Sequence, residues 1–275
     1  MRDYKEVIVL ASKWEMAQKA TNLIYSALVL IEGDSMADIL SAQPPIAHSR
    51  DDKQLTGLRA PRRPMTNEYY LSTPEIPNAC LLAVRAGARR HLAYAITKYH
   101  VSCQIYSIPY VDLEPFRTPN IRLSPFHNDH VRFATSIILA YSVIEELGLE
   151  IRASQSRPSR LESGEWNPKV RSDLEYRLIK ARIDIHEDIT WLSRGPSTNV
   201  ERIRPVKSRF KSSWSEGAVR DSEVELVEAI ARASWLRSKV SSHAFTELAK
   251  SLSPYDVANV QSVARRLLLS VLRFC

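Results

Sequence analysis

Glycine is scarce in this chain, at 7 of 275 residues, which is less than half of the usual share of roughly 7%. Glycine is the residue that most readily adopts positive φ, so its scarcity disfavours tight β-hairpin turns and favours helices. The 15 prolines gather between segments with helical hydrophobic spacing, where they end helices and open loops. We therefore expect an all-α protein, a helical bundle with long proline-rich connecting loops.

Cysteines and long apolar runs are also few. The three cysteines, Cys80, Cys103 and Cys275, are odd in number and widely spaced, which predicts neither a disulfide framework nor a zinc site. The most apolar stretch, residues 23–31, is too short to span a bilayer. The first residues lack the apolar core and cleavage site of a signal peptide. We expect a soluble, cytoplasmic protein with no membrane partner.

The motifs of the common enzyme classes are missing. The sequence has no Walker A loop, GxGxxG turn, GxSxG elbow or HExxH helix. His127 and His130 stand three positions apart, as two metal ligands on one helix could, but no further His or Cys cluster completes a set. We expect neither a metal nor another cofactor.

Positive charge is what the sequence has in excess, since 38 Lys and Arg against 31 Asp and Glu give a formal net charge of +7. Such a balance favours a polyanionic partner, above all nucleic acid, with a solvated basic surface as the alternative. A basic patch is expected on the helix that carries Arg85, Arg89 and Arg90.

The segment RIRPVKSRFK, residues 202–211, is the densest basic run and lies beside Trp214. Basic residues interleaved with aromatics can hold single-stranded nucleic acid through phosphate contacts and base stacking, and a basic linker between helices is the alternative. The candidate RNA-binding residues are Arg202, Arg204, Lys207, Arg209 and Lys211.

Hydrophobic spacing and capping residues predict the helices. Asn167 followed by Pro168 caps one helix, Ser222 with Glu225 forms a capping box on another, and Ser253 begins the last. The predicted helices cover residues 5–41, 78–105, 127–147 (ended by Gly148), 168–185, 186–193, about 222–245 and 253–275, and the long loops cover 42–77 and 107–126.

The candidate site lies in the run WLRSKVSSHAF, residues 235–245. Arginine binds phosphate and histidine titrates near neutral pH, so the pair could act on a phosphodiester without a metal. Arg237 and His243 stand six positions apart, which on a regular α-helix separates them by roughly 120° around the axis and about 9 Å along it. They would meet at one phosphate only through a local irregularity or by pooling across a dimer axis. A surface arginine and a helix-end histidine are the alternative.

This run, followed by an amphipathic helix, resembles the HEPN superfamily (higher eukaryotes and prokaryotes nucleotide-binding domains). Members are all-helical, and many carry Arg, then four to six residues, then His; here residues 238–242 intervene. The resemblance covers roughly residues 220–275, with support from the helix at 127–148. Ser238 stands where Asn, Asp or His is frequent, and Phe245 stands where members silenced by nucleotide transfer have a tyrosine.

The resemblance implies a metal-independent endoribonuclease that acts as a homodimer with a composite site, in many members within a prokaryotic defence or toxin system. The RNA 2′-hydroxyl would attack, His243 would serve as general acid or base, and Arg237 would stabilise the phosphorane. Ser238 would orient these groups, with Glu145 and Glu146 as candidate supporting carboxylates. The expected products are a 2′,3′-cyclic phosphate and a 5′-hydroxyl, so DNA should resist. An active enzyme of this kind would need restraint, which suggests a regulatory protein partner.

Two other functions stay open: a catalytically silent HEPN-like module that binds RNA or protein, and a helical scaffold or antitoxin-like subunit. The expected division of the chain is an N-terminal helical subdomain, residues 1–126, and a HEPN-like helical bundle, residues 127–275, that carries Arg237 and His243.

Overall fold

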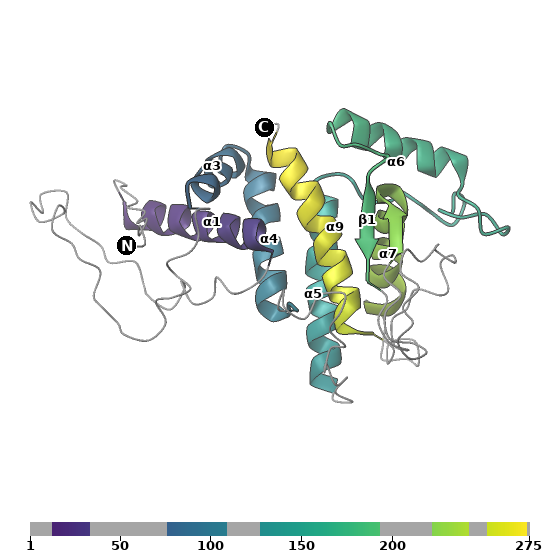
Figure 1. The fold of residues 1–275 in the computed structure, drawn as a ribbon, viewed down its shortest axis with the longest axis horizontal. Coiled ribbons are helices and arrows are strands. Elements are labelled where there is room, and N and C mark those ends of the chain that lie inside the picture. Colours follow the sequence, from purple (N-terminus) through teal and green to yellow (C-terminus); the bar gives the residue numbers. More distant parts are fainter. Residues whose placement is uncertain (1–12, 34–75, 109–126, 193–221, 242–251, 274–275) are drawn as a thin grey trace, which may run out of the picture.

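The computed structural model describes residues 13–33, 76–108, 127–192, 222–241 and 252–273. These residues contain seven α-helices, one π-helical turn and two short strands (Figure 1), so the predicted all-α class is confirmed. The elements are α1 (Trp14–Glu32), α3 (Ile76–Gly87), α4 (Arg90–Ile105), α5 (His127–Glu146), α6 (Pro168–Lys180), β1 (Asp188–Trp191), β2 (Ser222–Glu225), α7 (Leu226–Trp235), η3 (Leu236–Ser241) and α9 (Pro254–Arg273). Nearly all of the two predicted long loops lies outside the described residues.

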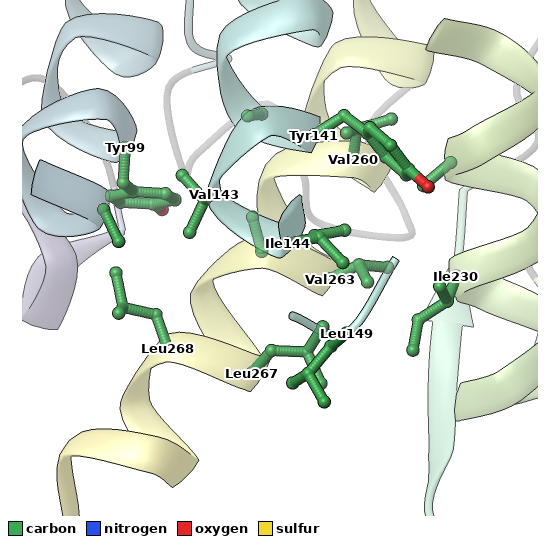
Figure 2. Packing of buried hydrophobic residues seen from close by; sticks show 14 of the residues in the cluster. Tyr99, Tyr141, Val143, Ile144, Leu149, Ile230, Val260, Val263, Leu267 and Leu268 are labelled. Atoms are coloured by element: carbon green, nitrogen blue, oxygen red, sulfur yellow. The ribbon is translucent and has the colours of Figure 1, made fainter. Parts of the chain in front are cut away.

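Helix α9 occupies the centre of the fold, between α4 and α5 on one side and α7 on the other (Figure 1). Its predicted apolar stripe is buried against both neighbours. Figure 2 shows this packing, in which side chains of α9 meet those of α4, α5 and α7: Val260, Val263, Leu267 and Leu268 face Tyr99, Tyr141, Ile144 and Ile230. The same cluster of buried side chains continues into α1 and α3, and the proposed division of the chain after residue 126 stays a prediction.

A buried polar contact fixes α9 against α4 and α5. The Nε2 amide of Gln261 donates to the hydroxyls of Ser102 and Ser136, each 3.1 Å away, and to the Tyr106 carbonyl at 2.7 Å. Ser102 and Ser136 also bond each other's backbone carbonyls, at 2.9 Å in both directions. Because a buried donor left without a partner is costly, these bonds favour one register of the three helices.

Arginines from α9 and α3 bond the carbonyls at the ends of neighbouring helices. Arg265 donates to the Leu30 carbonyl at 2.8 Å and to the Ile31 carbonyl, which places a cation at the negative end of α1. Gly33 ends α1 with φ of +84°. The conformation favours glycine, and a Cβ at this position would lie 3.1 Å from the Arg265 Nε, so the Arg265 side chain would have to shift slightly.

The predicted helix over residues 186–193 is wrong, because its centre forms strand β1. Ile189 and Trp191 are buried while Asp188 and Thr190 are exposed, and this alternation is that of a strand with one face on a core. β1 pairs antiparallel with β2 (Ile189 opposite Val224). The partner lies far along the chain, so the local sequence gave no sign of the pairing.

The predicted capping box of Ser222 and Glu225 is wrong for the same reason. Residues 222–225 form strand β2, and α7 begins at Leu226 without a side-chain cap. Val224 is buried, and Thr190 donates to the Glu223 carboxylate across the strands at 3.0 Å. Pairing with β1 therefore replaces the first helical turn that the capping signal predicted.

The other two capping predictions are confirmed. The Asn167 Oδ1 accepts from the backbone N–H of Lys169 at 3.1 Å, with Pro168 at the first helical position. At the start of α9, the Asp256 carboxylate accepts from the backbone N–H of Ser253 at 2.8 Å. These signals succeed because all of their partners lie within one turn.

Several predicted boundaries also change. The predicted helix at 78–105 is two helices, α3 and α4, separated by a turn at Ala88 and Arg89, and the first of them already begins at Ile76. Helix α6 ends at Lys180 rather than at residue 185. Of the predicted helix at 5–41, the structure describes α1 up to Glu32, and residues 5–12 and 34–41 lie outside the described residues.

Candidate functional site

Arg237 lies on η3, where helix α7 passes into a π-helical turn against α5. π-helical turns are rare in proteins overall, and those that occur often lie at functional sites. The 120° separation expected for Arg237 and His243 assumed a regular α-helix, and that assumption is wrong for Leu236–Ser241. The turn covers Arg237 and residues 238–241 of the interval between the two residues. His243 itself lies outside the described residues.

The Arg237 guanidinium is held by two side chains of α5. Its Nη2 lies 3.3 Å from the Glu145 Oε1, and its central carbon lies 6.0 Å from the centroid of the Tyr141 ring. Glu145 and Tyr141 stand four positions apart, so they share one face of α5. The side chains of Arg237 and Glu145 are 40% and 39% exposed, which leaves the guanidinium accessible to a ligand from solvent.

Tyr141 is the buried residue next to the Arg237 guanidinium. Its side chain is buried, and Figure 2 shows its hydroxyl directed toward α7. Burial raises the pKa of Tyr141 above its ordinary value of 10.0; the Ser234 hydroxyl and the Ile151 backbone oppose this shift, and Glu145 and Glu150 add to it. The phenol is therefore neutral at ordinary pH. Tyr141 is not among the site residues predicted from the sequence, although its four-residue spacing from Glu145 could have placed it beside the site.

The other predicted site residues either make contacts away from the Arg237 guanidinium or lie outside the described residues. Ser238 is half-buried, and its hydroxyl donates to the Ser234 carbonyl one turn back, at 2.7 Å. Glu146 faces α4, where its carboxylate accepts from the Lys98 Nζ at 2.7 Å. Glu145 is thus the predicted carboxylate that reaches Arg237. The candidate RNA-binding residues Arg202, Arg204, Lys207, Arg209 and Lys211 lie outside the described residues.

A second arginine–carboxylate cluster lies on the same helix, and the sequence did not reveal it. The Glu228 carboxylate accepts from the Arg160 Nη2 at 2.7 and 2.6 Å and from the Trp166 Nε1 at 3.1 Å. The Nε of Arg232 lies 3.6 Å from the same carboxylate, and its guanidinium lies 5.4 Å from the centroid of the Trp191 ring. We call these five residues the Glu228 cluster.

Arg232 is fully buried in the Glu228 cluster. Among the residues that the structure describes, none of its guanidinium nitrogens has a hydrogen-bond acceptor. Desolvation lowers its pKa, and the charge of Glu228 acts in the opposite direction. The Glu228–Arg232 spacing of four residues was visible in the sequence as a helical pair, but Arg160 and both tryptophans reach it from distant positions.

The described part of the chain contains neither a metal-ligand cluster nor a membrane-spanning helix. In the five described ranges, no three or more His, Cys, Asp or Glu side chains gather as they would around a metal ion. Of the helices in these ranges, none is long and apolar enough to cross a membrane.

The described residues define an all-α protein with a small antiparallel sheet. No protein-family model, curated protein or solved structure matches the chain.

Proposed function

We propose that this protein is a metal-independent endoribonuclease of the HEPN type, and that its biological setting is a prokaryotic defence or toxin system in which it is the effector. The observation that carries the proposal is the placement of Arg237, a half-exposed guanidinium on a π-helical turn, held by one carboxylate that is itself exposed. A phosphate can displace or share such a contact, because the bond to Glu145 is single and solvated.

The proposed chemistry follows from RNA carrying its own nucleophile. The 2′-hydroxyl attacks the adjacent phosphorus, and the bond to the 5′-oxygen of the next nucleotide breaks. His243 moves the protons, since its unperturbed pKa lies near neutral. Arg237 stabilises the charge that develops on the phosphorane oxygens. Glu145 holds the guanidinium in place before RNA binds, and Ser238 is the candidate orienting hydroxyl. The products are a 2′,3′-cyclic phosphate and a 5′-hydroxyl.

The direct test is RNA cleavage by the purified full chain in EDTA. We expect the chain to cleave RNA and to leave DNA intact. Arg237→Ala and His243→Ala should each lower the rate at least about 100-fold, the smallest effect typical of losing one acid–base or oxyanion-stabilising group. Arg152→Ala is a matched control, because Arg152 also pairs on the surface with one carboxylate, Glu150. Equal cleavage by the wild type and both site variants would refute the assignment.

The proposed site is composite, with Arg237 and His243 supplied by a homodimer. Mixing the two inactive variants tests this, because a dimer of one Arg237→Ala chain and one His243→Ala chain retains one intact arginine and one intact histidine. If one chain supplies the arginine and the other the histidine, the mixture regains activity that neither variant has alone. A mixture as inactive as its components, although exchange of subunits is verified by mass, would place the site within one chain.

A catalytically silent module that binds RNA or protein is the second candidate. The observation that favours it is Ser238, which replaces the Asn, Asp or His frequent in the superfamily and donates its proton to a backbone carbonyl. RNA binding without cleavage in the same assay would establish this function instead.

A further inference from the structure

The geometry points to a second RNA-contact surface, formed where the turn between α3 and α4 meets the end of α9. We define the α3–α4 basic surface by four arginines: Arg85 on α3, Arg89 and Arg90 at the start of α4, and Arg273 on the last turn of α9. The choice of RNA rests on the proposed function, whereas binding at this surface does not require cleavage.

The surface is basic without compensation. The sequence contains no Asp or Glu from residue 76 to residue 105, which is the whole of α3 and α4. In the described part of the chain, the exposed side chains of Arg89, Arg90 and Arg273 form no ion pair or hydrogen bond. Other arginines of this protein differ, since those of α6 bond Asp or Glu carboxylates within 3.0 Å.

Arg85 joins the two parts of the surface. Its Nη1 donates to the Leu272 carbonyl at 3.1 Å and to the Arg273 carbonyl at 3.2 Å. This bond satisfies carbonyls at the end of α9 and brings Arg273 beside α3. Figure 1 shows α3 and the start of α4 beside the C-terminal end of α9, so the four arginines come from neighbouring parts of three helices.

The arginines at the start of α4 lower the stability of the free protein. The N-terminal end of a helix carries partial positive charge, so cations there are unfavourable and acidic residues are preferred, by about 0.3–1 kcal/mol each. Helix α4 has Arg89 as its N-cap residue, with no side-chain cap, and no acidic residue in its first turn. The fold gains nothing from this charge, whereas a polyanion would relieve it.

An exposed aromatic ring extends the surface along α4. Tyr94 follows Arg90 by four positions, so the two side chains share one helical face, and Tyr94 is 56% exposed. The Lys98 ammonium lies 4.5 Å from the centroid of the Tyr94 ring, and its charge is paired with the Glu146 carboxylate at 2.7 Å. Arginines that bind phosphates beside an aromatic ring that can stack on an unpaired base fit single-stranded RNA better than a duplex.

The test is binding of a labelled single-stranded RNA made wholly of 2′-O-methyl nucleotides, which cannot be cleaved through the 2′-hydroxyl. We compare the full chain with Arg89→Glu/Arg90→Glu. Loss of two phosphate contacts should weaken binding roughly 10- to 30-fold at 0.1 M salt and lower the salt slope by about 1.4, given a slope near 0.7 per phosphate on single strands. Tyr94→Ala should weaken binding at least about fivefold.

The matched control is Lys169→Glu/Lys180→Glu, which makes the same change of charge at two exposed, unpaired lysines of α6. It should retain the wild-type slope. The melting temperature separates binding from folding, because Arg89→Glu/Arg90→Glu places acidic residues at the start of α4 and should raise it. Lower affinity in a variant of higher stability would support the surface. Equal affinity in both double variants and the wild type would overturn it.

Failure of the α3–α4 basic surface and failure of the nuclease assignment give different results in these experiments. If Arg89→Glu/Arg90→Glu loses binding while no chain cleaves RNA, the surface stands and the nuclease assignment fails. If the wild type cleaves RNA and the double variant binds it unchanged, the nuclease stands and the surface is overturned. Arg237→Ala should cleave poorly and, because it loses one phosphate contact, should bind the 2′-O-methyl RNA less tightly than the wild type but more tightly than Arg89→Glu/Arg90→Glu.

Discussion

Helix α7 and the turn that follows it carry two arginine–carboxylate contacts of opposite character. In the Glu228 cluster the carboxylate accepts two bonds from Arg160 and one from Trp166, and the neighbouring Arg232 is fully buried. At η3, Arg237 and Glu145 meet at a single distance of 3.3 Å, each about two-fifths exposed. The contacts lie less than two helical turns apart along the sequence.

The difference separates a structural contact from one that is available for chemistry. A buried carboxylate that holds two arginines cannot release one without leaving charge in a low-dielectric environment. A solvated pair contributes about 1 kcal/mol or less to stability, so its arginine can turn to a phosphate at little cost. The predictions below test whether the two contacts behave this differently.

The largest expected effect is that of Glu228→Ala. This change leaves the buried Arg232 and the mostly buried Arg160 without their shared carboxylate, which should lower the free energy of unfolding by about 3–5 kcal/mol. Chemical denaturation followed by circular dichroism measures the loss. Glu145→Ala is the control and should cost about 1 kcal/mol or less. Equal losses in the two variants would contradict the distinction.

Arg232→Met should have the opposite sign to Glu228→Ala. The guanidinium has no hydrogen-bond acceptor within the described ranges, and the Glu228 carboxylate keeps its bonds to Arg160 and Trp166. Replacing buried ionic groups by apolar side chains of similar volume is often neutral or stabilising by about 1–4 kcal/mol when no buried charge is left unpaired. We expect a melting temperature equal to or above that of the wild type. A loss as large as that of Glu228→Ala would show that Arg232 has a buried anionic partner besides Glu228.

A smaller change is expected for Glu145→Gln, which removes the charge that holds Arg237 and keeps the shape. The free energy of unfolding should change by less than about 1 kcal/mol. If Glu145 orients the guanidinium before RNA binds, cleavage should weaken without being abolished, and the effect of Glu145→Gln should vanish in an Arg237→Ala background. Additive losses in the double variant would separate Glu145 from the site.

The smallest expected effect is a loss of stability at alkaline pH that arises from the raised pKa of Tyr141. Burial raises its pKa in the folded state, so above pH 10.0 the unfolded chain loses the phenolic proton while the folded chain retains it. The stability that the raised pKa represents is complete below pH 10.0 and is lost as the pH rises through the folded-state value. Denaturation midpoints of the wild type should fall more steeply than those of Tyr141→Phe above that pH. Parallel curves would contradict this account.

The parts of the fold that were predictable are those set by local contacts. Helix starts at Pro168 and Pro254 followed from capping residues whose partners lie within one turn, and the buried stripe of α9 followed from its spacing. β1 and β2 were missed because each depends on a partner more than 30 residues away. The four-residue stretch at Ser222–Glu225 met a helix-capping rule locally, and the sheet overrode it.

The sequence also indicated part of the candidate site. Arg237 and Glu145 were both expected at the site, and the structure places them in contact. The π-helical turn was not expected, because helical spacing alone does not distinguish it from a regular helix. The Glu228 cluster also went unseen, since Arg160, Trp166 and Trp191 come to it from separate segments.

One pair of measurements on a single variant tests the central claim most directly. Arg237→Ala is assayed for RNA cleavage in EDTA and, in the same preparation, for its free energy of unfolding. We expect the cleavage rate to fall at least about 100-fold while stability changes by less than about 1 kcal/mol. Undiminished cleavage, or a loss of cleavage accompanied by unfolding of the chain, would contradict the claim that Arg237 serves the chemistry and Glu228 the fold.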